Sequence, residues 1–185
     1  MHLLCIMRKR IRPKKLTVAH ASGYDLAMLI TALLFAHLVA AKPTVGQVLD
    51  MMSDLPALEG RSDVRHVDFS NKRDAIEISK AIVEAADTWY EAQLMVVYAA
   101  YESNFVAHAV GDHGLSFGAW QLRGISTECA FIPRCAAQVW VKRARRAAVD
   151  CAQNDERERL APLASGNCDH ARKKTRWRVE LAESL

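Results

Sequence analysis

An apolar helical pattern that runs directly into a glycine-rich loop constrains this chain more than any other feature. The pattern has the i, i+3, i+4, i+7 spacing of one buried helix face, in Leu94, Val97, Tyr98 and Tyr101. We expect this helix to cover 91–102 and to end at Glu102, which prolongs the apolar stripe. The loop over 104–116 contains glycines, which allow tight turns and close approach of the backbone to a ligand.

Glu102 is the acid of this stretch best suited to chemistry. A carboxyl group at the mouth of an apolar helix loses hydration in its charged form. Burial therefore favours the protonated form that a general acid needs near neutral pH. The alternative interpretation is a solvated acid at a helix end, with no chemical role.

Two linked motifs add a family resemblance to this pattern. The helix ends in Glu102-Ser103, and a short polar, glycine-rich turn then leads to Gly118-Ala119-Trp120-Gln121. Their order and spacing resemble the active-site segment of the lytic transglycosylases, in the lysozyme-like superfamily that also includes goose-type lysozymes. The resemblance covers about residues 75–185 and is strongest over 98–122. It implies a lysozyme-like fold that is mainly α, with a small irregular or β-like loop lobe.

The resemblance also implies a reaction. Glu102 would be the catalytic acid, a glycan would bind across the loop near Gln121, and Ser103, Asp112 and Ser116 are further substrate-binding candidates. The implied reaction cleaves the β-1,4 bond between N-acetylmuramic acid and N-acetylglucosamine in peptidoglycan. Glu102 would act first as acid and then as base toward the muramic 6-hydroxyl, which leaves a 1,6-anhydro end. No metal or organic cofactor is implied, and the partner is the peptidoglycan glycan strand.

One late segment departs from the family pattern. The family often has a Tyr-Asn pair before an Ala-Gly, and the matching place here is Leu163-Ala164-Ser165-Gly166. Leu163 then replaces a tyrosine that usually lies close to the catalytic glutamate and the sugar. This departure leaves open a catalytically weak lysozyme-like module that binds peptidoglycan or supports an envelope or virion assembly.

Asp112 leaves a second alternative open. It lies ten residues after Glu102 and could position a water on the far side of the sugar, as in a muramidase-type hydrolase. Aspartate in a glycine-rich turn more commonly fixes that turn through its own backbone. We favour the turn role, and therefore a transglycosylase over a hydrolase.

The same loop contains weaker signals for other chemistry. Gly114–Gly118 fits Gly-x-Ser-x-Gly, in which Ser116 would be the nucleophile of an α/β-hydrolase. Nothing before it indicates the strand that this motif requires, so we expect Ser116 to bond the loop or a sugar hydroxyl. His108 and His113 flank Asp112 without close partner ligands, and we expect no metal site there.

Residues 1–41 have the features of an export signal. Six basic residues precede an apolar run over 26–41, and small residues at 39–41 offer a cleavage site. The alternative is an uncleaved membrane anchor, but 16 residues are few for a span of about 20. We expect an exported protein, periplasmic or in the cell envelope, with only transient membrane contact through residues 26–41. A membrane-anchored protein facing the periplasm and a virion-associated one are the alternatives.

The formal net charge of +4 belongs mostly to this leader. Residues 1–41 hold six basic and one acidic side chain of the total of 25 and 21, so 19 basic and 20 acidic ones remain. The mature chain is therefore nearly neutral, and its charge does not indicate nucleic-acid binding. We expect a monomer.

Four cysteines follow the leader, at 129, 135, 151 and 168. An even number in a small exported domain predicts two disulfides, with three connectivities. We predict Cys129–Cys135 and Cys151–Cys168, because both pairs close short loops. Zinc is the competing interpretation, but no Cys-x-x-Cys pair supports it.

The remaining patterns divide the chain into the export signal over 1–41, a mature arm over 42–70 with one short helix at most, and a domain over 71–185. Further helices are predicted in this domain over 72–87, 134–153 and 156–164, and from 167 or 169 toward 185. Trp120 could stack on a sugar, but we favour a place in the core.

Overall fold

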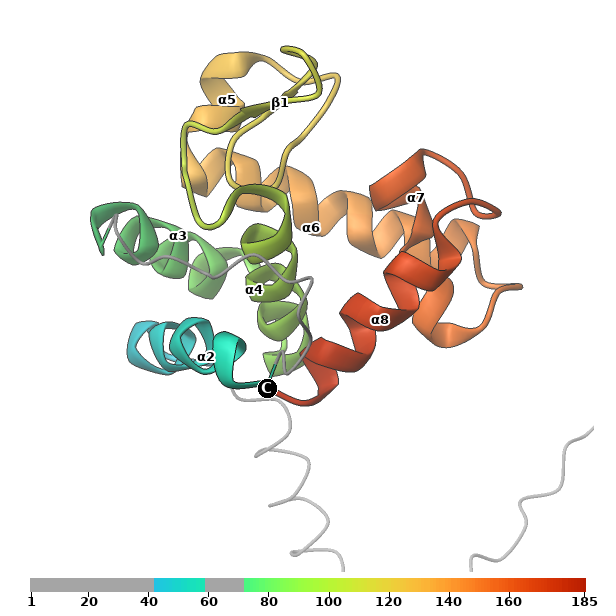
Figure 1. Cartoon of the computed structure of the whole chain (residues 1–185), viewed down its shortest axis with the longest axis horizontal. Helices are drawn as coiled ribbons and strands as arrows, with labels where there is room; N and C mark the ends of the chain where they lie inside the picture. Colours follow the sequence, from blue (N-terminus) through green and yellow to red (C-terminus); the bar gives the residue numbers. More distant parts are fainter. Residues whose placement is uncertain (1–41, 59–71) are drawn as a thin grey trace, which may run out of the picture. The chain divides into compact units, whose positions relative to one another are not determined.

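The computed structural model describes residues 42–58 and 72–185, so the predicted export signal lies outside the described residues. The described chain is mainly helical, as the sequence predicts, with one two-stranded sheet (Figure 1). Its elements in chain order are helices α2 (Val45–Leu58), α3 (Lys72–Ala85) and α4 (Trp89–Ser103), strands β1 (Val110–Gly111) and β2 (Ser116–Phe117), helices α5 (Thr127–Phe131) and α6 (Pro133–Asp150), the 3-10 turn η1 (Glu156–Glu158), and helices α7 (Ala161–Ser165) and α8 (Arg172–Glu183). Within 42–58 and 72–185, no helix combines the length and hydropathy that a membrane span needs.

Helix α2 brings the mature arm into the core. Its buried side chains recur at the spacing of one helix face and are Val48, Met51, Met52 and Leu55. They belong to the same apolar cluster as the buried faces of α3 and α4. The core therefore begins before residue 71, and the arm supplies one of its helices.

Helices α3 and α6 pack together with faces that agree with the predicted patterns. On α3 the apolar face is buried through Ile78 and Ile82, while Glu77 and Lys80 form an exposed ion pair of 3.0 Å. On α6 the inward side is built from alanines around the buried Trp140. Small residues on this face allow the two helices to approach closely around that one large ring.

Helix α4 positions the candidate site. It contacts α2, α6 and α8, and nine successive residues over 92–100 are buried. Its first turn is capped by Thr88, whose hydroxyl accepts a hydrogen bond from the Glu91 amide. It ends at Asn104, which adopts the left-handed conformation with φ of 55°. This sharp stop turns the chain at Glu102 into the loop lobe (Figure 1).

The loop lobe is a small hairpin followed by a tight turn. Strands β1 and β2 are antiparallel, with Val110 opposite Phe117, and Phe117 also pairs with Leu122. The turn between Phe117 and Leu122 places Trp120 inside the core, where its indole Nε1 donates a hydrogen bond to the Met95 carbonyl at 3.0 Å. The predicted core role of Trp120 is confirmed. The short helix α5 was not predicted.

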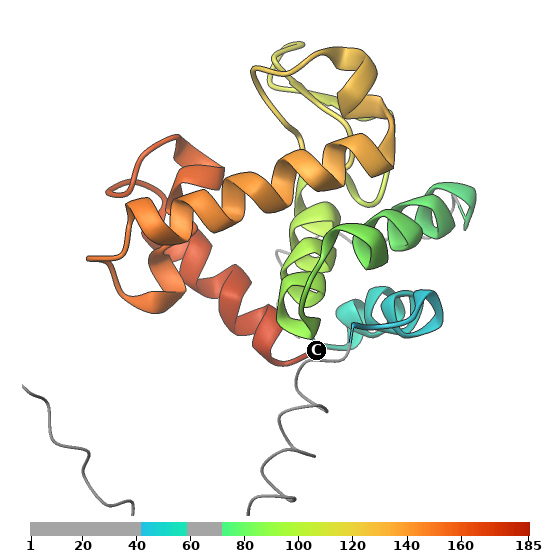
Figure 2. The ribbon, with the colours of Figure 1, turned by 180° about the vertical axis from the view of Figure 1, so that it is seen from behind.

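Both predicted disulfides are present. Cys129–Cys135 closes a loop at the start of α6, and Cys151–Cys168 closes the segment after its end. Figure 2 shows α6 along its length, with α5 at one end and the η1–α7 segment at the other. Disulfides are typical of proteins in an oxidising, exported environment.

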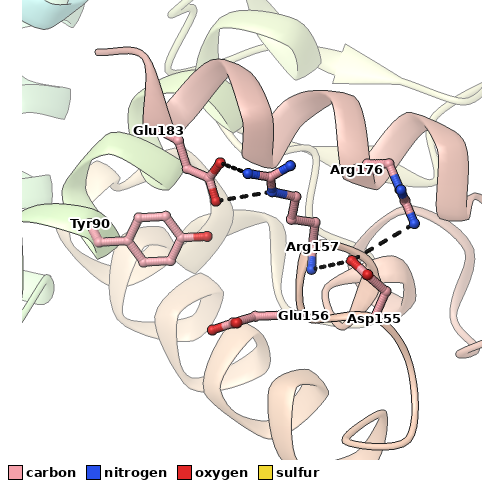
Figure 3. A pocket seen from close by; sticks show the side chains of 6 residues that line it. All are labelled: Tyr90, Asp155, Glu156, Arg157, Arg176 and Glu183. Atoms are coloured by element: carbon pink, nitrogen blue, oxygen red, sulfur yellow. Dashed lines mark hydrogen bonds and ion pairs between the residues drawn. The ribbon is translucent and has the colours of Figure 1, made fainter.

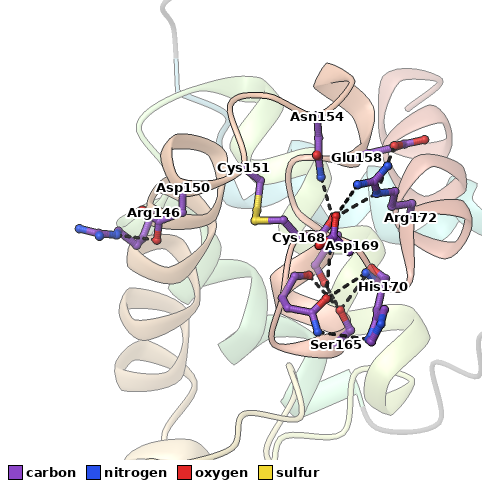
Figure 4. Close-up of a disulfide and its surroundings, with 12 residues drawn as sticks. Arg146, Asp150, Cys151, Asn154, Glu158, Ser165, Cys168, Asp169, His170 and Arg172 are labelled. Atoms are coloured by element: carbon purple, nitrogen blue, oxygen red, sulfur yellow. Dashed lines mark hydrogen bonds and ion pairs between the residues drawn. A yellow bond between two sulfur atoms is a disulfide. The ribbon is translucent and has the colours of Figure 1, made fainter.

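The last three elements are shorter than the sequence indicates. The single helix predicted over 156–164 is divided into η1 and α7, with Pro162 in the first turn of α7. The final helix begins at Arg172, because the Asn167 side chain accepts the amides of Asp169 and His170 in a local turn. The Cys168 carbonyl accepts hydrogen bonds from the side chains of Asn154 and Arg172 (Figure 4).

Candidate functional site

Glu102 lies in the last turn of α4 with two cations from α8 beside it. Its Oε1 accepts a hydrogen bond of 2.5 Å from the Arg178 guanidinium, and the Lys174 ammonium lies 3.9 Å from the same oxygen. The Glu102 side chain is 23% exposed, so it is accessible from solvent. Charge-assisted bonds of this kind are short and strong, and this one fixes the orientation of the Glu102 carboxyl group.

Arg178 is the feature of the site that the sequence analysis missed. Its side chain is only 1% exposed, although arginine is rarely buried without a partner. The guanidinium carbon lies 4.6 Å from the centre of the Tyr98 ring, within the range of a cation–π contact. One signal was available: Arg178 falls three and four residues before Leu181 and Ala182, on the inward face of the final helix.

Three polar atoms beside this ion pair are buried without a hydrogen-bond partner among the described residues. They are the Tyr98 hydroxyl, the Thr175 hydroxyl and Arg178 Nε. Burial raises the pKa of Tyr98 to about 12, although the Arg178 charge acts against this rise. The Glu102 carboxylate is thus bonded to a buried arginine that lies beside the Tyr98 ring.

The Lys174 ammonium interacts electrostatically with Glu102 and with Asp112 of the loop lobe. The pKa of its half-exposed ammonium is lowered by burial and by the Arg178 charge. The Glu102 and Asp112 carboxylates both act in the opposite direction. Of these two carboxylates, Glu102 has the larger effect on the Lys174 ammonium and Asp112 the smaller.

The Asp112 carboxylate is engaged inside the loop lobe. It pairs with Arg123 at 2.6 Å and accepts a hydrogen bond from the Ser116 hydroxyl at 2.9 Å. The Arg123 hydrogen bond, followed by that of Ser116, lowers the pKa of Asp112. Asp112 also has a left-handed φ of 49°. These contacts fit the turn role, but they run through side chains of the lobe and not through its own backbone.

Ser116 and Gln121 are brought together as a buried link within the lobe. The Ser116 hydroxyl lies 2.9 Å from Gln121 Oε1, and Gln121 Nε2 donates to the Gly118 carbonyl at 2.9 Å. A Cβ on Gly111 would crowd the end of the Gln121 side chain and the Ser116 hydroxyl, so the glycine allows this pair to lie against the backbone.

Ser103 has a structural position at the end of α4. Its hydroxyl donates to the Ala99 carbonyl at 3.1 Å and accepts from the Val106 amide at 3.2 Å. The following loop is further tied to α3, because the Asp74 carboxylate accepts the Ala107 amide at 2.9 Å. These bonds fix the exit of the chain from α4, and so the direction of Glu102.

Two weaker signals find no support in the local structure. Ser116 lies in β2 of a hairpin, is almost fully buried, and is followed by a turn where a nucleophile elbow requires a helix. His108 packs against the Phe131 ring at 5.3 Å. Across 42–58 and 72–185, no cluster of three or more His, Cys, Asp or Glu side chains is suited to a metal ion.

Leu163 occupies the place where the resemblance would put a tyrosine. It lies in α7, is partly buried, and packs against the apolar core. Tyr98 and Tyr101 are the tyrosines nearest Arg178, at 4.6 and 5.9 Å from its guanidinium carbon. Both come from α4: Tyr101 directly precedes Glu102, and Tyr98 lies about one turn before it.

A hollow of about 500 Å³ lies at the opposite end of the α4–α8 pair (Figure 3). It is lined by Tyr90, Asp155, Glu156, Arg157, Arg176 and Glu183. Its charges already pair with one another: Arg157 contacts Glu183 at 2.7 Å, and Arg176 lies 3.8 Å from Asp155. None of the residues singled out in the sequence lines it.

No known family, curated protein or solved structure matches this chain.

Proposed function

We propose that the chain is a peptidoglycan lytic transglycosylase with Glu102 as its single acid and base. The observation that carries this proposal is the placement of Glu102: a solvent-accessible carboxylate at a helix end, fixed by the buried Arg178 beside the loop lobe. The motif resemblance supplies the reaction class. A lysozyme-like fold belongs to the same proposal, which the mainly α architecture and the small hairpin lobe support.

The reaction follows from one carboxyl group changing its protonation state twice. Protonated Glu102 gives its proton to the glycosidic oxygen, which takes the electron pair as its bond to the muramic anomeric carbon breaks. The resulting carboxylate then accepts the proton of the 6-hydroxyl while that oxygen bonds the anomeric carbon. The products are a free 4-hydroxyl and a 1,6-anhydro end, and Glu102 regains its proton for the next cycle.

The contacts of Asp112 favour this outcome over hydrolysis. A hydrolase would need a second carboxylate that is free to position a water. The Asp112 carboxylate is already bonded to Arg123 and Ser116. Its engagement in the loop lobe supports the transglycosylase, in which no second acid is required.

The setting of the protein is part of the proposal. The two disulfides indicate an oxidising, exported environment, and peptidoglycan lies in such a compartment. We place the mature chain in the periplasm or cell envelope, as a monomer that acts on glycan strands. A virion-associated enzyme that crosses the wall would have the same chemistry.

A second candidate is a peptidoglycan-binding module without catalysis. The buried ion pair favours it, because Glu102 and Arg178 tie α4 to α8 and such a pair can be purely structural. The replacement of the family tyrosine by Leu163 points the same way. This candidate predicts binding to purified cell walls with no release of soluble muropeptides.

Mass spectrometry of the soluble products from purified peptidoglycan tests both candidates. We expect the mature wild-type chain to release muropeptides that end mainly in 1,6-anhydro-N-acetylmuramic acid. Products ending in reducing N-acetylmuramic acid would indicate a hydrolase. Wall binding without soluble products would establish the module.

A further inference from the structure

The burial of Arg178 is difficult to explain by stability alone. Transferring a guanidinium into the interior is costly, and an apolar side chain of similar volume often serves stability equally well or better. Buried polar groups normally have hydrogen-bond partners, yet Arg178 Nε has none among the described residues. What Arg178 does make is one short bond to Glu102 Oε1.

The surroundings hold the guanidinium in one orientation. Its carbon lies 4.6 Å from the Tyr98 ring centre, and Tyr98 itself packs against Trp140 at 5.1 Å. This stack joins α8, α4 and α6 through three buried side chains. Because Tyr98 and Trp140 are fixed by the core, Arg178 can direct Glu102 without moving itself.

We infer that Arg178 is a positioning residue that assigns different roles to the two carboxyl oxygens of Glu102. The inference rests on the proposed function. Oε1 accepts the hydrogen bond from Arg178 and also faces Lys174 at 3.9 Å, so Oε2 is the oxygen left to face the substrate. The proton that Glu102 gives to the glycosidic oxygen, and the proton that it later takes from the 6-hydroxyl, are therefore both carried on Oε2. Arg178 holds the carboxyl group in one orientation through both steps.

A charge-removing variant and a charge-keeping variant at this position test the inference. Arg178→Gln removes the cation, and we expect muropeptide release to fall on the order of ten-fold at the wild-type pH optimum. The loss should fall on kcat and leave KM within two-fold of wild type, because the buried Arg178 acts through Glu102. Arg178→Lys keeps a cation that can donate to Glu102 but not the planar fork, so it should restore part of the lost kcat.

Arg176→Gln is the matched control. Arg176 lies two residues away on α8, is about half exposed, and pairs with Glu158 at 2.7 Å at a distance from Glu102. The same change there should leave both kcat and KM within two-fold of wild type. A loss caused only by weakening α8 would follow the unfolded fraction of each variant and leave the kcat of the folded protein unchanged.

The outcomes separate this inference from the proposed function. A folded Arg178→Gln variant with the wild-type kcat and KM would overturn the role of Arg178 while leaving the enzyme assignment in place. Where Arg178→Gln does not fold, Arg178→Lys decides, and a full wild-type rate would overturn the inference. A wild-type chain that releases no muropeptides would overturn the proposed function, and the inference with it.

Discussion

The two ends of the α4–α8 pair carry ion pairs of opposite character. At the end of α4, Glu102 meets Arg178, which is 1% exposed. At the other end, Arg157 meets Glu183 with exposures of 46% and 39%. Exposed pairs contribute about 0–1 kcal/mol, whereas removing one partner of a buried pair costs about 3–5 kcal/mol. The α4–α8 pair thus has one end where the exposed ion pair contributes little to stability. At its other end, removing either charge leaves the remaining one without its partner.

The tyrosines of α4 follow the same division. Burial raises the pKa of Tyr90 at the exposed end, with Glu183 and Glu156 acting in the same direction. At the buried end, burial raises the pKa of Tyr98 further, to about 12. Charge and exposure therefore differ between the two ends of α4. A catalytic carboxylate is favoured at the end where the acid is fixed by a buried partner and is still accessible to solvent.

The largest effect should follow Glu102→Gln. The amide cannot donate the reaction proton, so wall cleavage should fall on the order of 10²-fold or more. It also leaves Arg178 buried without its carboxylate, and the free energy of unfolding should fall by about 3 kcal/mol or more. Urea unfolding and muropeptide release measure the two losses. The buried pair thus couples the loss of cleavage to a loss of stability.

The double variant Glu102→Gln/Arg178→Gln separates the two losses. With both charges gone, the free energy of unfolding should return to within about 1–2 kcal/mol of wild type, while cleavage stays lost. A double variant as unstable as the single one would mean that shape, and not the unpaired charge, causes the loss. Cleavage within a few-fold of wild type in either variant would remove Glu102 from the chemistry.

Opening the Cys151–Cys168 bridge should have the next largest effect. Cys151→Ser/Cys168→Ser should lower the free energy of unfolding by about 2–4 kcal/mol, because the bridge restricts the unfolded chain. The bridged segment carries Asp155 and Arg157 of the exposed end, so hydrogen exchange should rise there and not in 92–100. Equal exchange increases at both ends of α4 would contradict the independence of the two ends.

A small effect is expected for Arg157→Gln. Its partners Glu183 and Glu180 are exposed, so its loss should change the free energy of unfolding only slightly. The difference from wild type should shrink further at high salt. Chemical denaturation at two ionic strengths measures it. A loss as large as that of Glu102→Gln would refute the contrast between the ends.

The smallest change in activity is expected for Asp112→Asn. Asparagine can keep hydrogen bonds of the turn, so 1,6-anhydro products should continue to form at most of the wild-type rate. The lowered pKa of Asp112 means that its carboxylate stabilises the fold above its ordinary titration range, and that this contribution disappears as the pH falls through the lowered pKa. Thermal unfolding of the variant should therefore depend less on pH on the acid side. An inactive variant with reducing-end products from wild type would establish the hydrolase.

An alkaline titration compares the tyrosines directly. A buried phenol titrates only near pH 12, so Tyr98 should stabilise the fold fully below about pH 10 and lose this contribution as the pH rises through 12. Ultraviolet absorbance of Tyr98→Phe should lack the latest step of the folded wild-type titration. Loss of an early step would mean that Tyr98 is accessible, contrary to its burial.

Local patterns in the sequence predicted more of the scaffold than of the site. The stripes of α3, α4 and α6, the core place of Trp120 and both disulfides all follow from spacing within short segments. Helix α2 was underestimated because Pro43, Gly46 and Pro56 suggested an irregular arm, although its apolar spacing was present. Packing against α3 and α4 decided its helical state, and a single segment does not reveal that packing.

The site depends on contacts that no local pattern contains. Glu102 and Arg178 are 76 residues apart in the sequence and 2.5 Å apart in the structure. An inward arginine on an amphipathic helix signals a buried partner, but it does not identify which acid supplies it. Asp112 was assigned to its turn from composition, whereas its partners Arg123 and Ser116 depend on the fold of the lobe.

The placement of the cysteines has a consequence for how the chain matures after export. The bridged pairs are separated by only 6 and 17 residues, and they stand at the two ends of α6. The six-residue separation of Cys129 and Cys135 is the shortest, so this bridge should form first, at the lowest entropic cost. Cys135 is then no longer open to Cys151, and Cys151 and Cys168 are left to pair with each other, so the chain should need little help from a disulfide isomerase.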